Sequence, residues 1–250
     1  MDRVLYQFPI SHYCEKARWV LDIKRIPYRI HNQLPGPHGP TNRGLTGRTS
    51  VPVLVEDGRA IGGSHAIAMH LEAQQPEPAL VPKSAAARAQ VDELVVYVDD
   101  VVGPAVRQYA YSLILPRIGM FREIFFGEYR GASKLIGSAL ARPLSWAIGS
   151  MYRVRDPSVR HVPDVLRTAA DRIESRLRDG AVYLFEDTLS LADITVASLL
   201  GPVIGPAGSP WELEIDIPEL RALRSELGAR PIGRYITDLY TRRPPTAALQ

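Results

Sequence analysis

Ser11 and Cys14 stand three positions apart, at the start of a segment whose apolar residues recur at helical spacing. A hydroxyl at a helix N-terminus can donate a hydrogen bond to a thiolate, and the unpaired N–H groups and helix dipole there add positive potential. A thiol with an ordinary pKa of about 8.5 is mostly protonated at neutral pH, and such surroundings lower that pKa. Ser11 therefore has two readings: it stabilises a thiolate, or it only caps the helix, which contributes about 1 kcal/mol.

Cys14 is the single cysteine of the 250 residues. One cysteine excludes an internal disulfide framework and a zinc site of four cysteines. Because serine occupies the first position of this C-x-x-C-like turn, the chain also lacks the dithiol that intramolecular disulfide exchange requires. The direction of the helix turns Cys14 inward, which predicts a buried, inert thiol. Glu15 follows in the first turn, where negative charge is favourable.

Other positions could bind a ligand through the backbone or at a helix start. Pro52 removes one N–H from a β-prone run and favours a cis bond after Val51, although an edge strand also tolerates proline. Ser64 is predicted to be the N-cap of a second helical segment, where its hydroxyl and the nearby N–H groups can bind an anion. Ser190 and Asp193 form a capping-box pattern before an apolar run, so we expect Asp193 to be structural.

The sequence gives no sign of several common kinds of site. His65 and His70 do not share a helix face, and His12 lies too close to Cys14 to converge with it, so we expect no metal site. The chain has no phosphate-binding loop, G-x-S-x-G elbow or dinucleotide fingerprint. Nucleophilic hydrolase and nucleotide-dependent chemistries are therefore disfavoured.

The charge and hydropathy of the sequence indicate where the protein is found and which partners it lacks. The formal net charge of +3 comes without a nucleic-acid-reading motif, so we expect no nucleic-acid partner. No long apolar stretch of a secretion signal follows the first residues. Residues 132–151, the most hydrophobic interior stretch, carry Lys134, Arg142 and Pro143 and make a poor bilayer span. We expect a soluble cytoplasmic protein.

The elements that must position these residues begin with a mixed α/β unit. Strands are predicted at residues 4–8, 26–30, 51–56 and 59–61, and helices at residues 12–24 and from Ser64 onward. Asp57-Gly58 between the last two strands is typical of a tight antiparallel hairpin. A loop rich in Gly, Pro, Asn and His is predicted from about 32 to 50. The order β-α-β followed by β-β-α is the thioredoxin-type plan.

A proline-rich segment from Gln74 to Pro82 is the best domain boundary. Beyond it the pattern is helical, and the 46% of hydrophobic residues suffice for a sizeable core. We expect a thioredoxin-like domain at 1–76, a linker at 77–83 and an all-helical domain at 84–250. A late helix is predicted to begin at Arg230-Pro231 and to end before Arg243-Pro244.

The middle of the helical part carries an unusual segment. Residues 101–160 hold nine basic and three acidic residues, a net +6, together with eight aromatic residues. Three readings stay open: extra helices that cover the core with arginines in water, an apolar wall for a co-substrate, or a basic amphipathic surface that contacts acidic membranes.

Four motifs in this order strongly resemble the glutathione transferase superfamily: S-H-Y-C-E-K-A-R-W-V-L, T-S-V-P-V-L, G-G-S-H-A-I-A-M-H-L-E and S-L-A-D-I-T-V-A-S-L-L. The first three fall in the N-terminal part and the fourth resembles the core helix of the all-α C-terminal domain of that family. Residues from Pro116 to about Arg160 match poorly, because typical relatives join two long helices there by a short turn, so the insertion is expected at about 113–160. The resemblance implies an insertion at this point.

The resemblance also implies site roles. It favours the thiolate-contacting role for Ser11, a cis Pro52, and backbone contacts from Val51 to the cysteinyl part of glutathione. Ser64 would receive the γ-glutamyl carboxylate. Before it the family usually carries an acidic residue or glutamine that holds the α-amino group. Here the residue is Gly63, which puts glutathione affinity in doubt and leaves room for a different thiol or for a contact from a partner chain.

Three further residues are weaker candidates. His65 could reach the ligand, although an exposed first-turn histidine is the simpler reading. His38 and Arg48 are the candidates for the glycyl carboxylate. Cys14 has the alternative of a mixed disulfide with glutathione.

The resemblance implies a glutathione-dependent transferase of the detoxification type that conjugates the thiolate to an apolar electrophile, with glutathione as co-substrate and without a metal. A glutathione-dependent isomerase or lyase needs the same thiolate. A non-catalytic protein that binds apolar ligands or a partner is the alternative from a different class. A homodimer is expected because dimers are common in the family.

Overall fold

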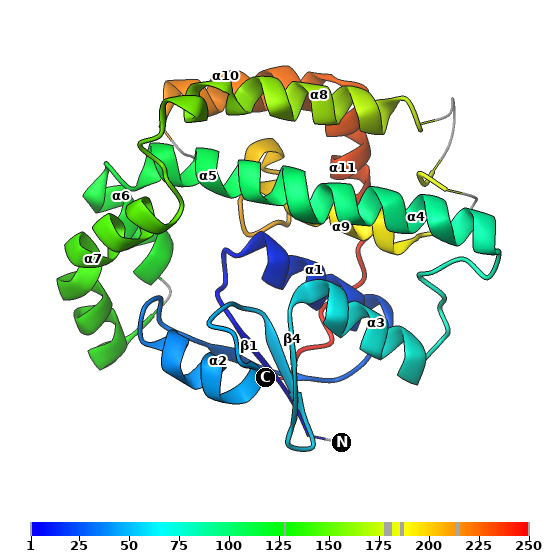
Figure 1. Ribbon diagram of the computed structural model, residues 1–250, viewed down its shortest axis with the longest axis horizontal. Helices are drawn as coiled ribbons and strands as arrows, with labels where there is room; N and C mark the ends of the chain where they lie inside the picture. Colours follow the sequence, from blue (N-terminus) through cyan, green and yellow to red (C-terminus); the bar gives the residue numbers. More distant parts are fainter. Residues whose placement is uncertain (1, 128, 178–181, 186–187, 214–215, 250) are drawn as a thin grey trace.

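A computed structural model of the chain describes residues 2–127, 129–177, 182–185, 188–213 and 216–249 (Figure 1). The first part contains β1 (Arg3–Gln7), α1 (His12–Ile23), β2 (Arg29–Asn32), α2 (His38–Thr46), β3 (Val53–Glu56), β4 (Arg59–Gly62) and α3 (Ser64–Gln74). The helical part contains α4 (Ala85–Tyr97), η1 (Val98–Val102), α5 (Gly103–Ile114), α6 (Ile118–Phe126), α7 (Gly131–Met151), η2 (Pro157–His161), α8 (Val162–Glu174), α9 (Leu191–Ile204), α10 (Pro218–Ala229) and α11 (Pro231–Thr241).

The sheet confirms the predicted thioredoxin-like plan. Its strand order is β2-β1-β3-β4, with β1 parallel to β2 and antiparallel to β3, and with β3 antiparallel to β4. Asp57 and Gly58 both have positive φ, 46° and 84°, as the predicted two-residue hairpin requires. In Figure 1 the sheet lies at the bottom of the molecule and the long helices α4 and α5 cross above α1. An all-helical C-terminal part thus follows the sheet.

Two sequence expectations in this part are wrong. The loop predicted at 32–50 contains helix α2, because the buried Asn42 side chain donates to Gln33 Oε1 and to the Ser50 carbonyl and holds the segment despite its Gly and Pro content. Gly47, at φ 75°, then ends that helix. Strand β2 begins at Arg29 rather than at 26, because Tyr28 instead bridges to Ala248 of the C-terminal tail.

Helix α9 forms the centre of the helical core. Nearly all of its residues are buried, and it packs against α1 and α4. Its start is the predicted capping box: the Asp193 carboxylate accepts from the backbone N–H of Ser190 at 2.6 Å and of Leu184 at 2.8 Å. Asp193 is therefore a structural residue, as predicted. Helix α11 likewise begins at Pro231 and ends before Arg243.

The predicted insertion forms two helices, α6 and α7, which pack against each other on the left of Figure 1. Leu144 and Ile148 of α7 line the cavity described below, which supports the reading of this segment as an apolar wall. Lys134 and Arg142 are exposed, and so are Leu135 and Trp146 on the outer face of α7. The predicted contact of this surface with acidic membranes stays a prediction.

Among the helices that the structure describes, none is long and apolar enough to cross a bilayer.

A buried ionic cluster joins α1 to the segment after α11. Arg243 donates to the carboxylate of Glu15 and, at 2.8 Å, to that of Asp22, while Arg18 pairs with Glu15 at 2.6 Å. The Glu15 and Asp22 side chains are almost fully buried. These ion pairs connect helix α1, near the start of the chain, to the segment near its end.

Candidate functional site

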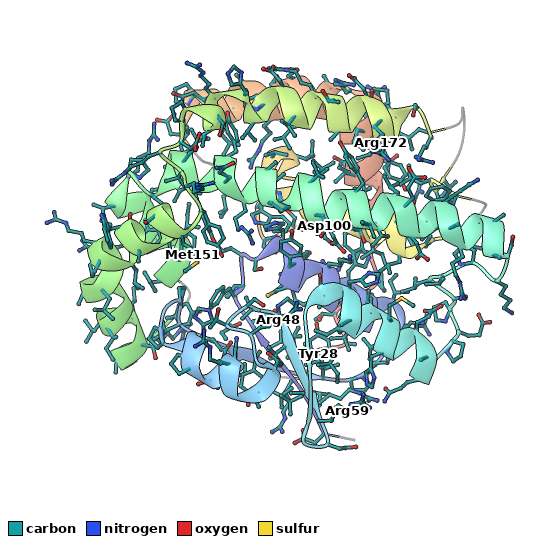
Figure 2. All side chains as sticks on the ribbon, in the orientation of Figure 1. Tyr28, Arg48, Arg59, Asp100, Met151 and Arg172 are labelled. Carbon is teal, nitrogen blue, oxygen red and sulfur yellow. The ribbon has the colours of Figure 1, made fainter. Side chains whose placement is uncertain are left out.

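A cavity of about 400 Å³ lies at the N-terminal end of α1. Its lining residues come from the segments after β2 and before β3 and from α5, α6 and α7, among other elements; Figure 1 shows where these elements lie. Met151 at the end of α7, labelled in Figure 2, belongs to its lining. Most lining side chains are apolar or aromatic; those used below are Ser11, His12, Tyr13, His38, Val51, Arg107, Tyr111, Tyr152 and Trp211.

Ser11 is the N-cap of α1 and lines the cavity. Its Oγ accepts from the backbone N–H of Cys14 at a long 3.4 Å, and its hydroxyl can donate either to the neighbouring Cys14 thiol or to a ligand in the cavity. The turn before it is fixed from the helical part, because Trp211 Nε1 donates to the Ile10 carbonyl at 3.1 Å. Ser11 thus combines a hydroxyl with a helix N-terminus at the edge of an apolar cavity.

The first turn of α1 packs closely against the first turn of α5. A Cβ at Gly103 would lie 2.5 Å from the Tyr13 hydroxyl, so glycine is needed for this close approach. Tyr13 donates to the Asp99 carbonyl at 2.7 Å, and His12 Nε2 lies 3.1 Å from the Gly103 carbonyl. Burial raises the pKa of Tyr13, which therefore keeps its proton. These bonds hold the first turn of α1 in place.

His12 gives the site a measurable pH dependence. Burial, and then the positive charge of Arg107, lower the pKa of His12 from 6.5 to about 3. The unfolded chain therefore binds a proton at this residue near pH 6.5, while the folded chain stays neutral. We expect the free energy of unfolding to fall as pH drops from about 6.5 to 4.5, by up to about 1.4 kcal/mol per pH unit from this residue.

The matched variant is His12→Gln, whose amide can still donate to the Gly103 carbonyl. Urea unfolding at several pH values should give a clearly flatter pH dependence for the variant over this window. Equal slopes for the two proteins would contradict the assignment.

Val51 presents free backbone groups to the cavity. The Val51–Pro52 bond is cis, as the resemblance implied, and Pro52 is buried. Neither the N–H nor the carbonyl of Val51 has a hydrogen-bond partner within the part of the chain described here. Val51 is partly buried in the cavity lining, so these two unpaired groups are suited to an extended peptide ligand.

The residues predicted around the start of α3 lie beside this cavity rather than in its lining. Ser64 is buried as the first residue of α3, and the N-cap is Gly63 rather than Ser64 as predicted. Gly63 has φ 94°, which favours glycine, and a Cβ there would meet nothing within 4 Å. His65 is exposed, in agreement with its simpler reading. Open space therefore adjoins Ser64.

The two candidates for a carboxylate differ in position. His38 lines the cavity, accepts from the Gly36 N–H at 3.0 Å, and packs its ring against Phe8. Burial lowers the pKa of His38. Arg48 is exposed and lies outside the cavity lining (Figure 2).

Cys14 is fully buried, and burial raises the pKa of its thiol. Both observations favour an inert thiol over a mixed disulfide.

Sequence reasoning missed the groups that α5 and α7 bring to the cavity. Arg107 and Tyr111 are four residues apart on α5, so they share a face, and Arg107 lies over the ring of Tyr152 at the end of α7. Helical spacing could have grouped the first two. Nothing in the sequence could have joined them to Tyr152 or Trp211, since those contacts are made by packing.

Comparisons with known proteins agree with this architecture. Residues 5–79 match the glutathione S-transferase N-terminal domain, and residues 156–225 match the glutathione S-transferase C-terminal domain. No curated protein sequence matches the chain.

Similar solved structures cover almost the whole chain. A glutathione S-transferase from Rhodospirillum rubrum F11 is 26% identical over 94% of this chain and 91% of that one, with a TM-score of 0.58. FzlA from C. crescentus is 24% identical over 100% and 96% of the two chains, with a TM-score of 0.60. The beta-etherase LigF from Sphingobium sp. strain SYK-6 is 20% identical over 96% and 100%, with a TM-score of 0.58. The last two similarities show a shared fold.

Proposed function

Because the chain belongs to the glutathione S-transferase family, we propose that it binds glutathione and transfers the glutathione thiolate to an apolar electrophile. The observation that carries this proposal is the placement of the Ser11 hydroxyl and the unpaired Val51 backbone in the lining of one cavity. The first group suits a thiolate and the second suits the peptide backbone beside it. A ligand that supplies both is a cysteinyl peptide.

The other site residues can be assigned to the successive parts of the glutathione molecule. The Val51 N–H and carbonyl pair with the cysteinyl residue, and the hydroxyl and N–H groups at the start of α3 bind the γ-glutamyl carboxylate at Ser64. His38 is the better candidate for the glycyl carboxylate, because it lines the cavity and Arg48 does not. Gly63 leaves the α-amino group without the side chain that relatives provide.

The chemical step needs little from the protein beyond position and charge. The thiolate sulfur attacks an electrophilic carbon, a C–S bond forms, and the leaving group departs with the electron pair of the broken bond. Ser11 and the N-terminus of α1 stabilise the thiolate, and the thiol proton passes to water. The apolar walls from α5, α6 and α7 hold the acceptor against the sulfur.

Glutathione binding is the first test. We expect isothermal titration to detect 1:1 binding by the wild type, and Ser64→Ala to raise the Kd by about 10- to 100-fold, because hydrogen bonds to charged groups contribute about 1.5–3 kcal/mol. Ser84→Ala is the matched control, since Ser84 precedes α4 and caps nothing through its side chain. Absence of binding by the wild type would refute the proposal and favour another thiol or a non-catalytic protein.

Product analysis separates the alternatives that use the same thiolate. A transferase accumulates a glutathione conjugate, whereas an isomerase or lyase regenerates free glutathione. The open space at Gly63 and the added helices α6 and α7 favour the non-catalytic alternative, a protein that binds apolar ligands or a partner. Binding of apolar ligands without glutathione binding would support it.

A further inference from the structure

The guanidinium of Arg107 lies at the cavity without an anionic partner. Its Cζ is 4.3 Å from the centre of the Tyr152 ring and 5.8 Å from that of Tyr13. Among the described residues no carboxylate lies within ion-pair distance of it, and its Nε is buried without a hydrogen-bond partner. The terminal Nη groups of Arg107 make no hydrogen bond or ion pair with the described residues, so they can donate to an acceptor that enters the cavity.

The surroundings of Arg107 strengthen its attraction for an anion. The cavity walls are mainly apolar and aromatic, with Ile114, Phe125 and Ile148 among them. In such a low-dielectric site a charge–charge interaction is stronger than in water. The charge of Arg107 already acts on its neighbours, because it helps to lower the pKa of His12. Arg107 therefore brings a positive charge to this end of the cavity.

Tyr111 offers a second donor on the same face of α5. Its ring lies 5.3 Å from the Tyr152 ring, and its hydroxyl has no hydrogen-bond partner among the described residues. Burial raises the pKa of Tyr111, so the hydroxyl keeps its proton at neutral pH. One guanidinium and one hydroxyl four residues apart on a helix can together bind a carboxylate.

We propose that the electrophilic acceptor carries a carboxylate on an apolar, aromatic body, and that Arg107 with Tyr111 binds this carboxylate while Ser11 holds the attacking thiolate. This inference rests on the proposed transferase function. The three residues line the same cavity, so one acceptor can contact the guanidinium through its charged end and present its electrophilic carbon to the sulfur. A neutral acceptor leaves the guanidinium unpaired. Arg107 is then a specificity-determining residue.

The experiment compares two acceptors with the same chloromethylbenzene reacting group, the anionic 4-(chloromethyl)benzoate and its neutral methyl ester, at saturating glutathione. In each reaction the C–S bond forms, chloride leaves with the electron pair of the C–Cl bond, and the thiol proton passes to buffer. We expect the wild type to have the higher kcat/KM for the carboxylate. Arg107→Gln should lower the carboxylate-to-ester ratio of kcat/KM by about 10- to 100-fold, and Arg107→Lys should restore part of it.

One control variant keeps the test specific. Arg117→Gln removes a positive charge just after α5 from an exposed side chain outside the cavity lining, and it should leave the ratio within about threefold. If Arg107→Gln lowers kcat/KM equally for the carboxylate and the ester, the proposal is overturned. Arg107 would then only pack against the ring of Tyr152. A wild type that does not prefer the carboxylate would overturn it as well.

Failure of the transferase function is detected separately. If neither acceptor gives a glutathione conjugate, isothermal titration with the unreactive 4-methylbenzoate still tests the carboxylate site without turnover. Binding that weakens at least tenfold in Arg107→Gln would support the site. Absence of binding, or equal binding by both proteins, would overturn it.

Discussion

Replacing Ser11 with alanine is expected to lower kcat/KM for glutathione conjugation by about 10- to 100-fold at neutral pH. In the proposed mechanism the Ser11 hydroxyl donates to the thiolate, and a hydrogen bond to a charged group contributes about 1.5–3 kcal/mol. Without it the pKa of bound glutathione rises toward the ordinary thiol value near 8.5, so the thiolate fraction falls. The loss should therefore shrink when the pH is raised.

The measurement is a pH–rate profile of wild type and Ser11→Ala at saturating glutathione, together with the ultraviolet absorbance of the bound thiolate. A shift of the apparent pKa by about one or two units is expected. Ser11→Thr, which keeps a hydroxyl, should retain much of the activity. Unchanged turnover in Ser11→Ala would remove Ser11 from the mechanism.

The capping role of Ser11 has to be separated from its chemical role. Because its Oγ accepts from Cys14 N at 3.4 Å, alanine also removes a weak N-cap, and a loss of up to about 1 kcal/mol in the free energy of unfolding is expected. Such a loss leaves the fold intact and changes the activity of folded enzyme little. Urea unfolding of the same variants measures it directly.

The fold was predictable because its signals are local. Asp57-Gly58 demands a tight hairpin, and Ser190 with Asp193 demands a helix start, whatever surrounds them. Helix α2 was missed because its local composition disfavours a helix, and the hydrogen bonds of Asn42 outweigh that preference. Tertiary contacts decide such segments, and a single sequence does not display them.

The residues of the candidate site also fall into two groups, those that the sequence indicated and those that only the packing brings together. Ser11 could be proposed because a helix start marks it in the sequence, and Val51 because the resemblance to the family implies backbone contacts before a cis proline. Arg107 counted only as one of nine bases in a segment of uncertain purpose, since the rings of Tyr13 and Tyr152 that flank it come from distant parts of the chain. The contact of Arg107 with the ring of Tyr152 depends on how α6 and α7 pack.

The contacts of Arg243 also depend on tertiary packing. Replacing this residue is expected to have the largest effect on the free energy of unfolding. We expect Arg243→Ala to lower the free energy of unfolding by about 3–5 kcal/mol, because it removes one partner from a buried ionic cluster. Asp22 then loses its guanidinium partner, and Glu15 keeps only Arg18. Arg242→Ala is the matched control, as this neighbour is exposed and makes no ion pair within the described residues.

The pH dependence of that loss identifies its cause. Burial alone raises the pKa of Glu15, but the charges of Arg18 and Arg243 outweigh burial and lower it below 4.5. A lowered carboxyl pKa stabilises the folded chain above the unfolded value and loses that contribution as pH falls through the folded one. The difference between wild type and Arg243→Ala in urea unfolding should therefore be larger at pH 7 than below about pH 4. A difference that does not change with pH would assign the loss to packing of Arg243 against Trp19, over whose ring its Cζ lies at 5.0 Å, rather than to the ion pairs.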